Sequence, residues 1–366
     1  MKPSVRIPLR IAPRLLNGVA PARPLHSSAI KAANVAPIVG TGPPPEAPIP
    51  TPQSVNDRVE RRRKQAEMLK TAKQIRTAKD GKNMPLKRRF WKDVAVHEVD
   101  GALEVHLDAR PLRHPHTKEI VRLPATKHAL ATALALEWDL LTSAQQATKQ
   151  HLIPLTSLVC RAIDIAQDDA SGTAEDAKIR STIATALLRY LDTDSLLCWA
   201  PPAGEYDLLN DAGESLRDVQ KQAAEETVAF LTTNVWPGIT IEPVLDGHSI
   251  VPRKQSDGVR EVVQGWIMGL GPWELAGLER AVLAGKSLIA AARFITEWSE
   301  GTVGLPGTQK EAKFGAEEAA RATSLEVDWQ TGQWGEVEDT HDVSKEDVRR
   351  QFGSVVLLVS GSAKRS

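Results

Sequence analysis

The stretch Ala284-Gly285-Lys286-Ser287 resembles part of a phosphate-binding loop. A complete loop needs another glycine five residues before Gly285, so that consecutive backbone N–H groups can wrap a phosphate. That position holds Arg280. We therefore interpret the stretch as an ordinary turn or helix start and expect no nucleotide there.

A second candidate for chemistry is the pair His114 and His116, which flank a proline. Zinc sites need further Cys, His or carboxylate ligands at characteristic spacings, and none follows this pair. We expect both histidines on a loop surface. No serine lies in a Gly-x-Ser-x-Gly elbow, and Cys160 and Cys198 lie in apolar stretches typical of buried thiols. These residues give no positive evidence for an enzyme, and we expect no metal and no cofactor; catalytic residues can still converge from distant parts of the chain.

Charge is divided unevenly along this chain of 366 residues, although it is neutral overall. Residues 1–90 carry 19 Lys and Arg against 5 Asp and Glu, whereas the remainder carries 27 against 41. An acidic body repels phosphates, so we predict no nucleic-acid partner. No apolar run reaches the roughly 18 residues of a membrane-spanning helix, so we also predict no insertion into a membrane.

The basic N-terminal part has the composition of a mitochondrial targeting segment. Residues 1–45 contain six Lys and Arg and no acid, and they are rich in Ala, Leu and Ile. We predict a transit peptide over residues 1–35, followed over 36–87 by a proline-rich linker and a charged, frayed segment. The location expected for the mature protein is the mitochondrial matrix.

Residues 88–150 are predicted to form a small α+β domain that begins with a β-hairpin. The strand-like runs 93–99 and 102–107 are joined by Asp100-Gly101. This dipeptide accepts the positive φ angles of a tight turn, so it is a strong hairpin signal.

A helix completes this domain. A short strand is expected around 119–123, after which Thr126 is in position to cap a helix that runs to about Leu141. Trp91 and Trp138 are assigned to the core of this unit.

Residues 151–360 are predicted to form a larger, all-α helical bundle domain, which makes the fold class α+β. Apolar residues recur at helical spacing between Gly and Pro punctuation, and heptads are not sustained, so a compact bundle is favoured over a coiled coil. The predicted helices span 156–167, 175–191, 205–233, 256–269, 272–284, 286–299, 309–330 and 344–359.

Several blocks of residues, in the same order, resemble those of the mitochondrial assembly chaperones that hold the alpha subunit of the ATP synthase catalytic head. The resemblance covers roughly residues 89–360. Ala109 replaces a glycine of the family's turn, which implies that this position needs no positive φ. The blocks are Arg89-Phe90-Trp91-Lys92, Leu107-Asp108-Ala109-Arg110-Pro111-Leu112, Leu136-Glu137-Trp138-Asp139, Ile153-Pro154-Leu155-Thr156-Ser157-Leu158, the run from Tyr190 to Trp199, and Leu325-Glu326-Val327-Asp328-Trp329-Gln330 with the following Gln333-Trp334-Gly335-Glu336-Val337-Glu338-Asp339.

This resemblance implies a chaperone with no enzymatic activity and no cofactor. Its client would be the unassembled alpha subunit, whose apolar interface stays exposed until the beta subunit covers it. An open surface of that kind aggregates, and a chaperone would prevent this by binding it. We expect the protein to be monomeric.

The resemblance also implies where the client binds. A glutamate in the Leu-Glu-x-x-aromatic-Gln block matters in the family, and Glu326 matches it; the alternative is that Glu326 caps a helix or pairs with Arg321 or Lys345. Trp329 and Trp334 are five residues apart, so on one helix they point in directions about 140° apart. We expect one of them in the core and the other exposed as an anchor. The predicted partner-binding residues are Glu326, Trp329, Gln330, Trp334 and Glu336.

Two other functions are compatible with the residues. The protein would be a matrix enzyme if a pocket between the two domains held convergent polar groups with shifted pKa values. It would be a permanent structural subunit of a mitochondrial complex if it stayed bound to its partner in fixed proportion.

Overall fold

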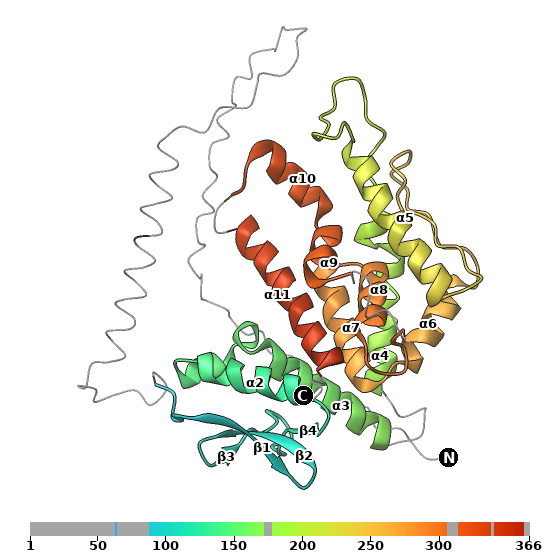
Figure 1. Cartoon of the computed structure of the whole chain (residues 1–366). Helices are drawn as coiled ribbons and strands as arrows, with labels where there is room; N and C mark the ends of the chain where they lie inside the picture. Colours follow the sequence, from blue (N-terminus) through green and yellow to red (C-terminus); the bar gives the residue numbers. More distant parts are fainter. Residues whose placement is uncertain (1–62, 64–87, 172–177, 306–313, 338–339, 362–366) are drawn as a thin grey trace, which may run out of the picture. The chain divides into compact units, whose positions relative to one another are not determined.

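The computed structural model describes residues 63, 88–171, 178–305, 314–337 and 340–361 (Figure 1). The predictions for the transit peptide and, apart from residue 63, for the linker and charged segment lie outside the described residues.

The expected hairpin is present. Strands β1 (Val94–Val99) and β2 (Ala102–Leu107) pair antiparallel, with Val99 opposite Ala102 across the turn. Asp100 and Gly101 have φ angles of 51° and 76°, which are the positive values that the sequence predicts for a tight turn.

Two short strands complete the sheet on β2. Strand β3 (Arg110–Pro111) and strand β4 (Arg122–Pro124) both pair with β2, antiparallel. The turn between β2 and β3 takes its positive φ at Asp108, at 53°, and not at Ala109. The Asp108 carboxylate fixes this corner, because its Oδ1 accepts hydrogen bonds from the backbone N–H groups of Lys92 and Asp93, each at 2.9 Å.

Helix α2 (His128–Leu140) lies between the sheet and the helical region (Figure 1). The prediction that Thr126 caps it is wrong: the residue before the helix is Lys127, and no side chain caps this end. The backbone carbonyl of Gly361 instead accepts hydrogen bonds from the N–H groups of Ala129 and Leu130, at 3.1 and 3.3 Å. A carbonyl from the far end of the chain therefore satisfies donors that a local cap would have met.

Trp91 and Trp138 are buried in the core, as predicted, with 1% and 8% of their surfaces exposed. Their ring centroids are 5.4 Å apart. The Trp138 indole N–H donates to Oγ1 of Thr156 at 2.8 Å, so the packing continues from the sheet and α2 into the next helix.

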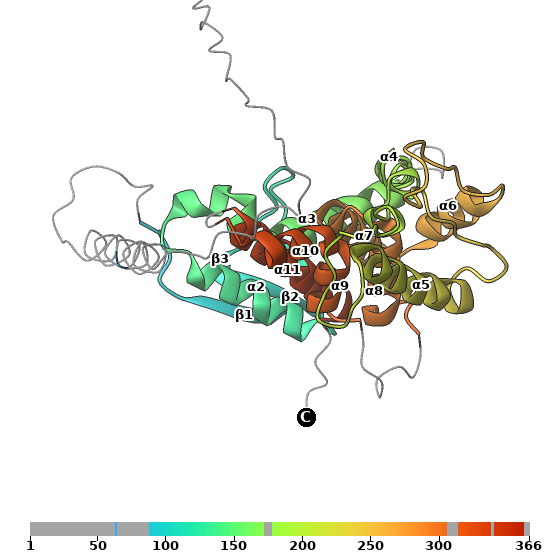
Figure 2. The ribbon, with the colours of Figure 1, turned by 90° about the horizontal axis from the view of Figure 1, so that it is seen from above.

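The rest of the described chain is mainly helical, as predicted, with two longer non-helical segments at 198–215 and 235–258. Seen from above, α4, α5 and α6 lie on the side of the helical region away from the sheet (Figure 2). The helices are α3 (Pro154–Ser171), α4 (Lys178–Leu187), α5 (Leu216–Asn234), α6 (Val259–Gly269), α7 (Pro272–Gly285), α8 (Leu288–Trp298), α9 (Ala316–Thr323), α10 (Leu325–Trp334) and α11 (His341–Ser360).

Two of the predicted helices differ from the observed ones by more than a few residues. The one placed at 205–233 begins only at Leu216, because Ser215 and Asp218 form a capping box that starts the helix there. The one placed at 309–330 is divided at Ser324, whose φ of −119° and ψ of 14° leave helical geometry; residues 309–313 lie outside the described part.

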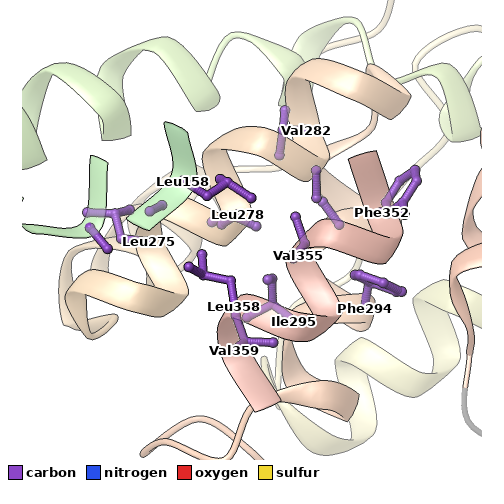
Figure 3. Close-up of a cluster of buried hydrophobic side chains, with 14 of the residues drawn as sticks. Leu158, Leu275, Leu278, Val282, Phe294, Ile295, Phe352, Val355, Leu358 and Val359 are labelled. Carbon is purple, nitrogen blue, oxygen red and sulfur yellow. The ribbon is translucent and has the colours of Figure 1, made fainter. Parts of the chain in front are cut away.

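The centre of the helical region lies where α3, α7, α8 and α11 meet (Figure 3). Leu278, Phe294 and Val355 are among the fully buried side chains there. Gly277 permits the close approach: a Cβ at this position would lie 3.0 Å from Cγ1 of Val359 and 3.2 Å from Cγ1 of Val355. A larger residue in α7 would push α11 away.

Two buried carboxylates attach helices to distant parts of the chain. Glu137 of α2 accepts hydrogen bonds from the backbone N–H groups of Leu155 and Thr156, at 2.8 and 2.9 Å, at the start of α3. Asp194 does the same for α8, where its Oδ2 accepts from the N–H groups of Leu288 and Ile289 at 2.6 and 3.0 Å. Both satisfy donors at helix N-termini, where negative charge is also favourable.

Among the described residues, no helix combines the length and the apolar character that crossing a bilayer requires.

Candidate functional site

Helix α10 carries four of the five predicted partner-binding residues, and it has no buried residue. It packs against α5 and α9. A helix whose side chains all reach solvent adds little to the core, because burial of apolar surface is the main source of folding stability. Its residues are therefore available for contact with another molecule.

Glu326 is exposed near the start of α10, and its carboxylate has no cationic partner among the described residues. The alternative prediction, that Glu326 caps a helix or pairs with Arg321 or Lys345, is wrong: no side chain caps α10, and among the described residues Glu326 forms no ion pair, while Lys345 pairs with Asp328 at 3.0 Å. The contact that Glu326 does make is with Gln330, whose Nε2 donates to Oε1 of Glu326 at 3.3 Å. The charge of Glu326 is thus free to meet an external donor.

Glu326 also lines a small hollow that brings two of the sequence blocks together. The hollow holds about 120 Å³ and is bordered by Ser195 and Leu196 on one side and by α10 on the other. Burial raises the pKa of the nearby Cys198, and the negative charges of Asp194 and Glu326 add to that rise. Blocks about 130 residues apart in the sequence therefore share one surface.

The two tryptophans of α10 are both outside the core. Trp334 has 71% of its surface exposed and Trp329 is half-buried, without packing against the buried core. The expectation that one of them is a core residue is wrong. The divided helix explains this, because α10 is a separate short segment that lies on the surface instead of continuing α9 into the bundle.

Glu336 is exposed in the loop after α10 and lines a second hollow, of about 200 Å³, between α10 and α11. His341 and Lys345 of α11 and Val327 of α10 line it too. Val327 borders both hollows, so the first turn of α10 separates them.

Three exposed apolar residues near this helix did not enter the predicted set. Val327, Val337 and Val343 have 46%, 57% and 58% of their surfaces exposed. Val337 and Val343 each follow an acidic residue in a strongly polar stretch. In the sequence, an isolated valine of this kind is only a weak indication of a binding surface. Together with Trp334, these residues give the surface an apolar component.

The stretch Gly285-Lys286-Ser287 forms the turn between two helices, as predicted. Lys286 adopts a left-handed conformation with a φ of 54° at the end of α7, and the Ser287 side chain accepts a hydrogen bond from the N–H of Ala290 at the start of α8. The side chain of Ser287 and the backbone of Lys286 therefore complete helix ends.

The two histidines do not share one environment. His116 is exposed as expected, but the expectation of a surface position is wrong for His114, which has 2% of its surface exposed. The Nδ1 atom of His114 accepts from the backbone N–H groups of His116 and Thr117, each at 3.3 Å. This loop therefore folds around the His114 ring, a use that spacing alone does not reveal.

The thiols are less uniform than the apolar stretches suggested. Cys160 is buried, whereas Cys198 is half-buried. Cys160 lines a cleft between α3 and α7, and burial raises the pKa of its thiol to about 12. A nucleophilic cysteine needs the opposite shift, so this geometry offers no activation of the thiol.

Comparison with known proteins identifies the family. The model of the ATP12 chaperone protein family matches residues 88–232. The chain is 33% identical over 284 residues to "Protein atp12, mitochondrial" of Schizosaccharomyces pombe, covering 75% of this chain and 82% of that protein. It is also 33% identical over 279 residues to "Protein ATP12, mitochondrial" of Saccharomyces cerevisiae, covering 74% of this chain and 83% of that one.

A solved structure supports the fold. The crystal structure of the Atu1473 protein from Agrobacterium tumefaciens aligns with a TM-score of 0.51 and 25% identity, over 76% of this chain and 86% of that chain. The sheet with its helix, followed by a helical region, is thus shared with a bacterial protein. With relatives of this identity and coverage, and with a family model that matches residues 88–232, the chain belongs to the ATP12 chaperone family.

Proposed function

We propose that this protein acts in the mitochondrial matrix as an assembly chaperone for the ATP synthase catalytic head. In this proposal it binds the unassembled alpha subunit, covers the apolar surface that the beta subunit later takes, and so prevents aggregation. It does this without catalysing a reaction. The named relatives are mitochondrial proteins, which supports import of this chain as well.

The observation that carries the proposal is the exposed helix α10. An indole that is 71% exposed, at Trp334, lies on the same helix as the carboxylate of Glu326, which has no cationic partner among the described residues. Tryptophan is favoured at the energetic centre of interfaces, and a free carboxylate binds an arginine of a partner through short, charge-assisted hydrogen bonds. The predicted residues Trp329, Gln330 and Glu336 would border these two contacts.

Reversible binding is compatible with this surface. The hollows on either side of α10 are small, and its apolar residues are separated by acidic ones. A chaperone has to release its client to the beta subunit, and interfaces of ordinary size cover a wide range of affinities. Moderate affinity at an exposed helix would allow that exchange.

The test is capture of purified alpha subunit by the immobilised full chain. Wild-type protein should retain the alpha subunit, and Glu326→Lys should weaken binding about tenfold or more, because it replaces a charge-assisted contact with repulsion. The matched control is Glu225→Lys, a charge reversal at an exposed position of α5. The control should bind as wild type does.

Three results would contradict the proposal. The first is failure of wild-type protein to retain the alpha subunit, and the second is equal binding by the variants at 326 and 225. Recovery of the protein from mitochondria in fixed proportion with the finished ATP synthase would indicate a permanent subunit instead of a chaperone.

A further inference from the structure

A cleft larger than either hollow beside α10 lies away from that helix. It holds about 820 Å³ and opens between the loop at His114–His116, the 3-10 segment around Gln150, α3 and α7. Clefts of about 300 to 1,000 Å³ are typical of ligand sites. None of its lining residues borders the two hollows beside α10, so it is a separate feature of the surface.

One wall of the cleft holds the guanidinium of Arg280. Its NH2 atom donates to Oγ of Ser157 at 3.2 Å. Within the described part of the chain, no carboxylate oxygen lies within 4.0 Å of a nitrogen of this guanidinium, the distance at which an ion pair forms. Burial lowers the pKa of Arg280, and the more distant charges of Glu279 and Asp347 act against that shift. A partly buried cation without a close partner is costly, so its retention suggests a use.

The other arginine of the cleft, Arg161, already has a partner. Glu279 holds Arg161 through two hydrogen bonds of 2.7 and 2.8 Å. Asp164 lies 3.2 Å from Nε2 of the buried His114, but this nitrogen makes no hydrogen bond among the described residues. Of the two arginines that line the cleft, Arg280 is therefore the one without an acidic partner in the described part of the chain.

The other lining residues suit a chain with both polar and apolar groups. Leu283 has 55% of its surface exposed at the edge of the cleft, and Ile153 and Leu158 are buried beneath. The exposed rim also presents His116 and Gln150, which can hydrogen-bond to a backbone. A polypeptide segment has these same two kinds of group.

We propose that this cleft binds an extended polypeptide segment and that Arg280 receives a carboxylate of that segment. The planar guanidinium offers paired N–H donors that match a carboxylate, which makes the contact both charged and directional. The proposal rests on the chaperone function, since the ligand of a chaperone is a polypeptide. It adds a second client contact that does not involve α10.

The test uses an array of immobilised ten-residue peptides that tile the alpha subunit, together with unrelated acidic peptides. Each acidic peptide is paired with a twin in which Asp and Glu are replaced by Asn and Gln. The full wild-type chain should retain acidic members at least tenfold better than their twins. Arg280→Gln should remove that preference.

Two further variants separate binding from folding. Leu283→Glu places a negative charge at an exposed position of the same wall, so it should also remove the preference without opening the core. Arg349→Gln removes a cation from an exposed position on α11 and should behave as wild type. Thermal unfolding of each variant establishes that the chain is folded.

Each outcome decides the proposal. Equal binding of acidic peptides and their twins, no peptide binding at all, or an unchanged preference in Arg280→Gln would overturn it. One further result would overturn it. If no peptide is retained, but inorganic phosphate raises the melting temperature of wild type and not of Arg280→Gln, the cleft holds a small oxyanion instead of a polypeptide.

The result also separates this proposal from the function proposed for α10. If the intact alpha subunit is captured through Glu326 but no peptide depends on Arg280, the cleft proposal fails alone. If acidic peptides bind through Arg280 while the alpha subunit is not captured, the proposed client is wrong and the cleft remains a peptide site.

Discussion

Replacing Asp194 by asparagine should change how the stability of the protein depends on pH. Asp194 is completely buried, and its carboxylate accepts hydrogen bonds from the N–H groups of Leu196, Leu288 and Ile289. Burial raises its pKa from 3.8 to about 6, although these hydrogen bonds act in the opposite direction. Burial and hydrogen bonding therefore make opposite predictions about acid stability, and the substitution distinguishes them.

The sign follows from proton binding. A folded pKa above the unfolded one means that the folded state holds more protons between the two values, so the stability due to Asp194 falls as pH rises through that range. With a folded pKa of about 6 and an unfolded value of 3.8, the linkage relation gives a loss of about 1.3 kcal/mol between pH 5 and pH 7.

The assay is urea unfolding followed by tryptophan fluorescence at pH 5, 6 and 7, for wild type and Asp194→Asn. The free energy of unfolding of wild type minus that of the variant should decrease by about 1.3 kcal/mol over this range. Contributions of other groups, including Glu137, cancel because both proteins contain them. Asp211→Asn, in an exposed loop, should leave the pH dependence as it is in wild type.

A flat difference, or one that increases with pH, would refute this reasoning. An increase would mean that the hydrogen bonds at the start of α8 stabilise the ionised carboxylate by more than burial destabilises it, which would place the folded pKa below 3.8.

Two further predictions concern the core and the surface. Glu137→Gln should lower the free energy of unfolding by about 1 to 3 kcal/mol, because an amide nitrogen cannot accept the hydrogen bonds from the N–H groups at the start of α3. The shift of the urea midpoint measures this loss. An unchanged midpoint would show that these hydrogen bonds add nothing to stability. Trp91→Ala should cost about 3 to 5 kcal/mol, whereas the exposed Trp334→Ala should change stability by less than about 0.5 kcal/mol and yet weaken capture of the alpha subunit. A Trp334→Ala variant that is strongly destabilised, or that binds as wild type does, would contradict the role given to this residue.

Much of the fold was predictable because its signals are local. Asp100-Gly101 determines its own turn, since the φ angles of two adjacent residues decide it. Gly271-Pro272 likewise begins α7. Proline suits this position because the first residue of a helix needs no backbone N–H for an intrahelical hydrogen bond. The capping box of Ser215 and Asp218 is equally local, and these two residues indicate the observed start of α5.

The bounds of other helices depended on contacts that periodicity does not contain. The first N–H groups of α2 donate to the carbonyl of Gly361, more than 200 residues away, and Thr126 does not cap the helix. Ser324 divides α9 from α10, although an uninterrupted helix is compatible with the sequence around it. In both cases the tertiary arrangement selected among backbone conformations of similar local energy.

For the candidate site, the residue types came from the sequence and the exposure came from the structure. The ordered blocks indicated the family and drew attention to Glu326 and Trp334. Only the folded chain showed that Glu326 has no described cationic partner and that Trp334 lies on the surface. The cleft at Arg280 had no sequence signal at all.

By itself, then, the sequence determined the family, the hairpin and the succession of helices, because each depends on neighbouring residues or on blocks read in order. Tertiary structure alone decided which charges have partners and which aromatic side chains are buried. The physical reason is that burial and ion pairing are properties of the space around a side chain, and residues far apart in the chain fill that space.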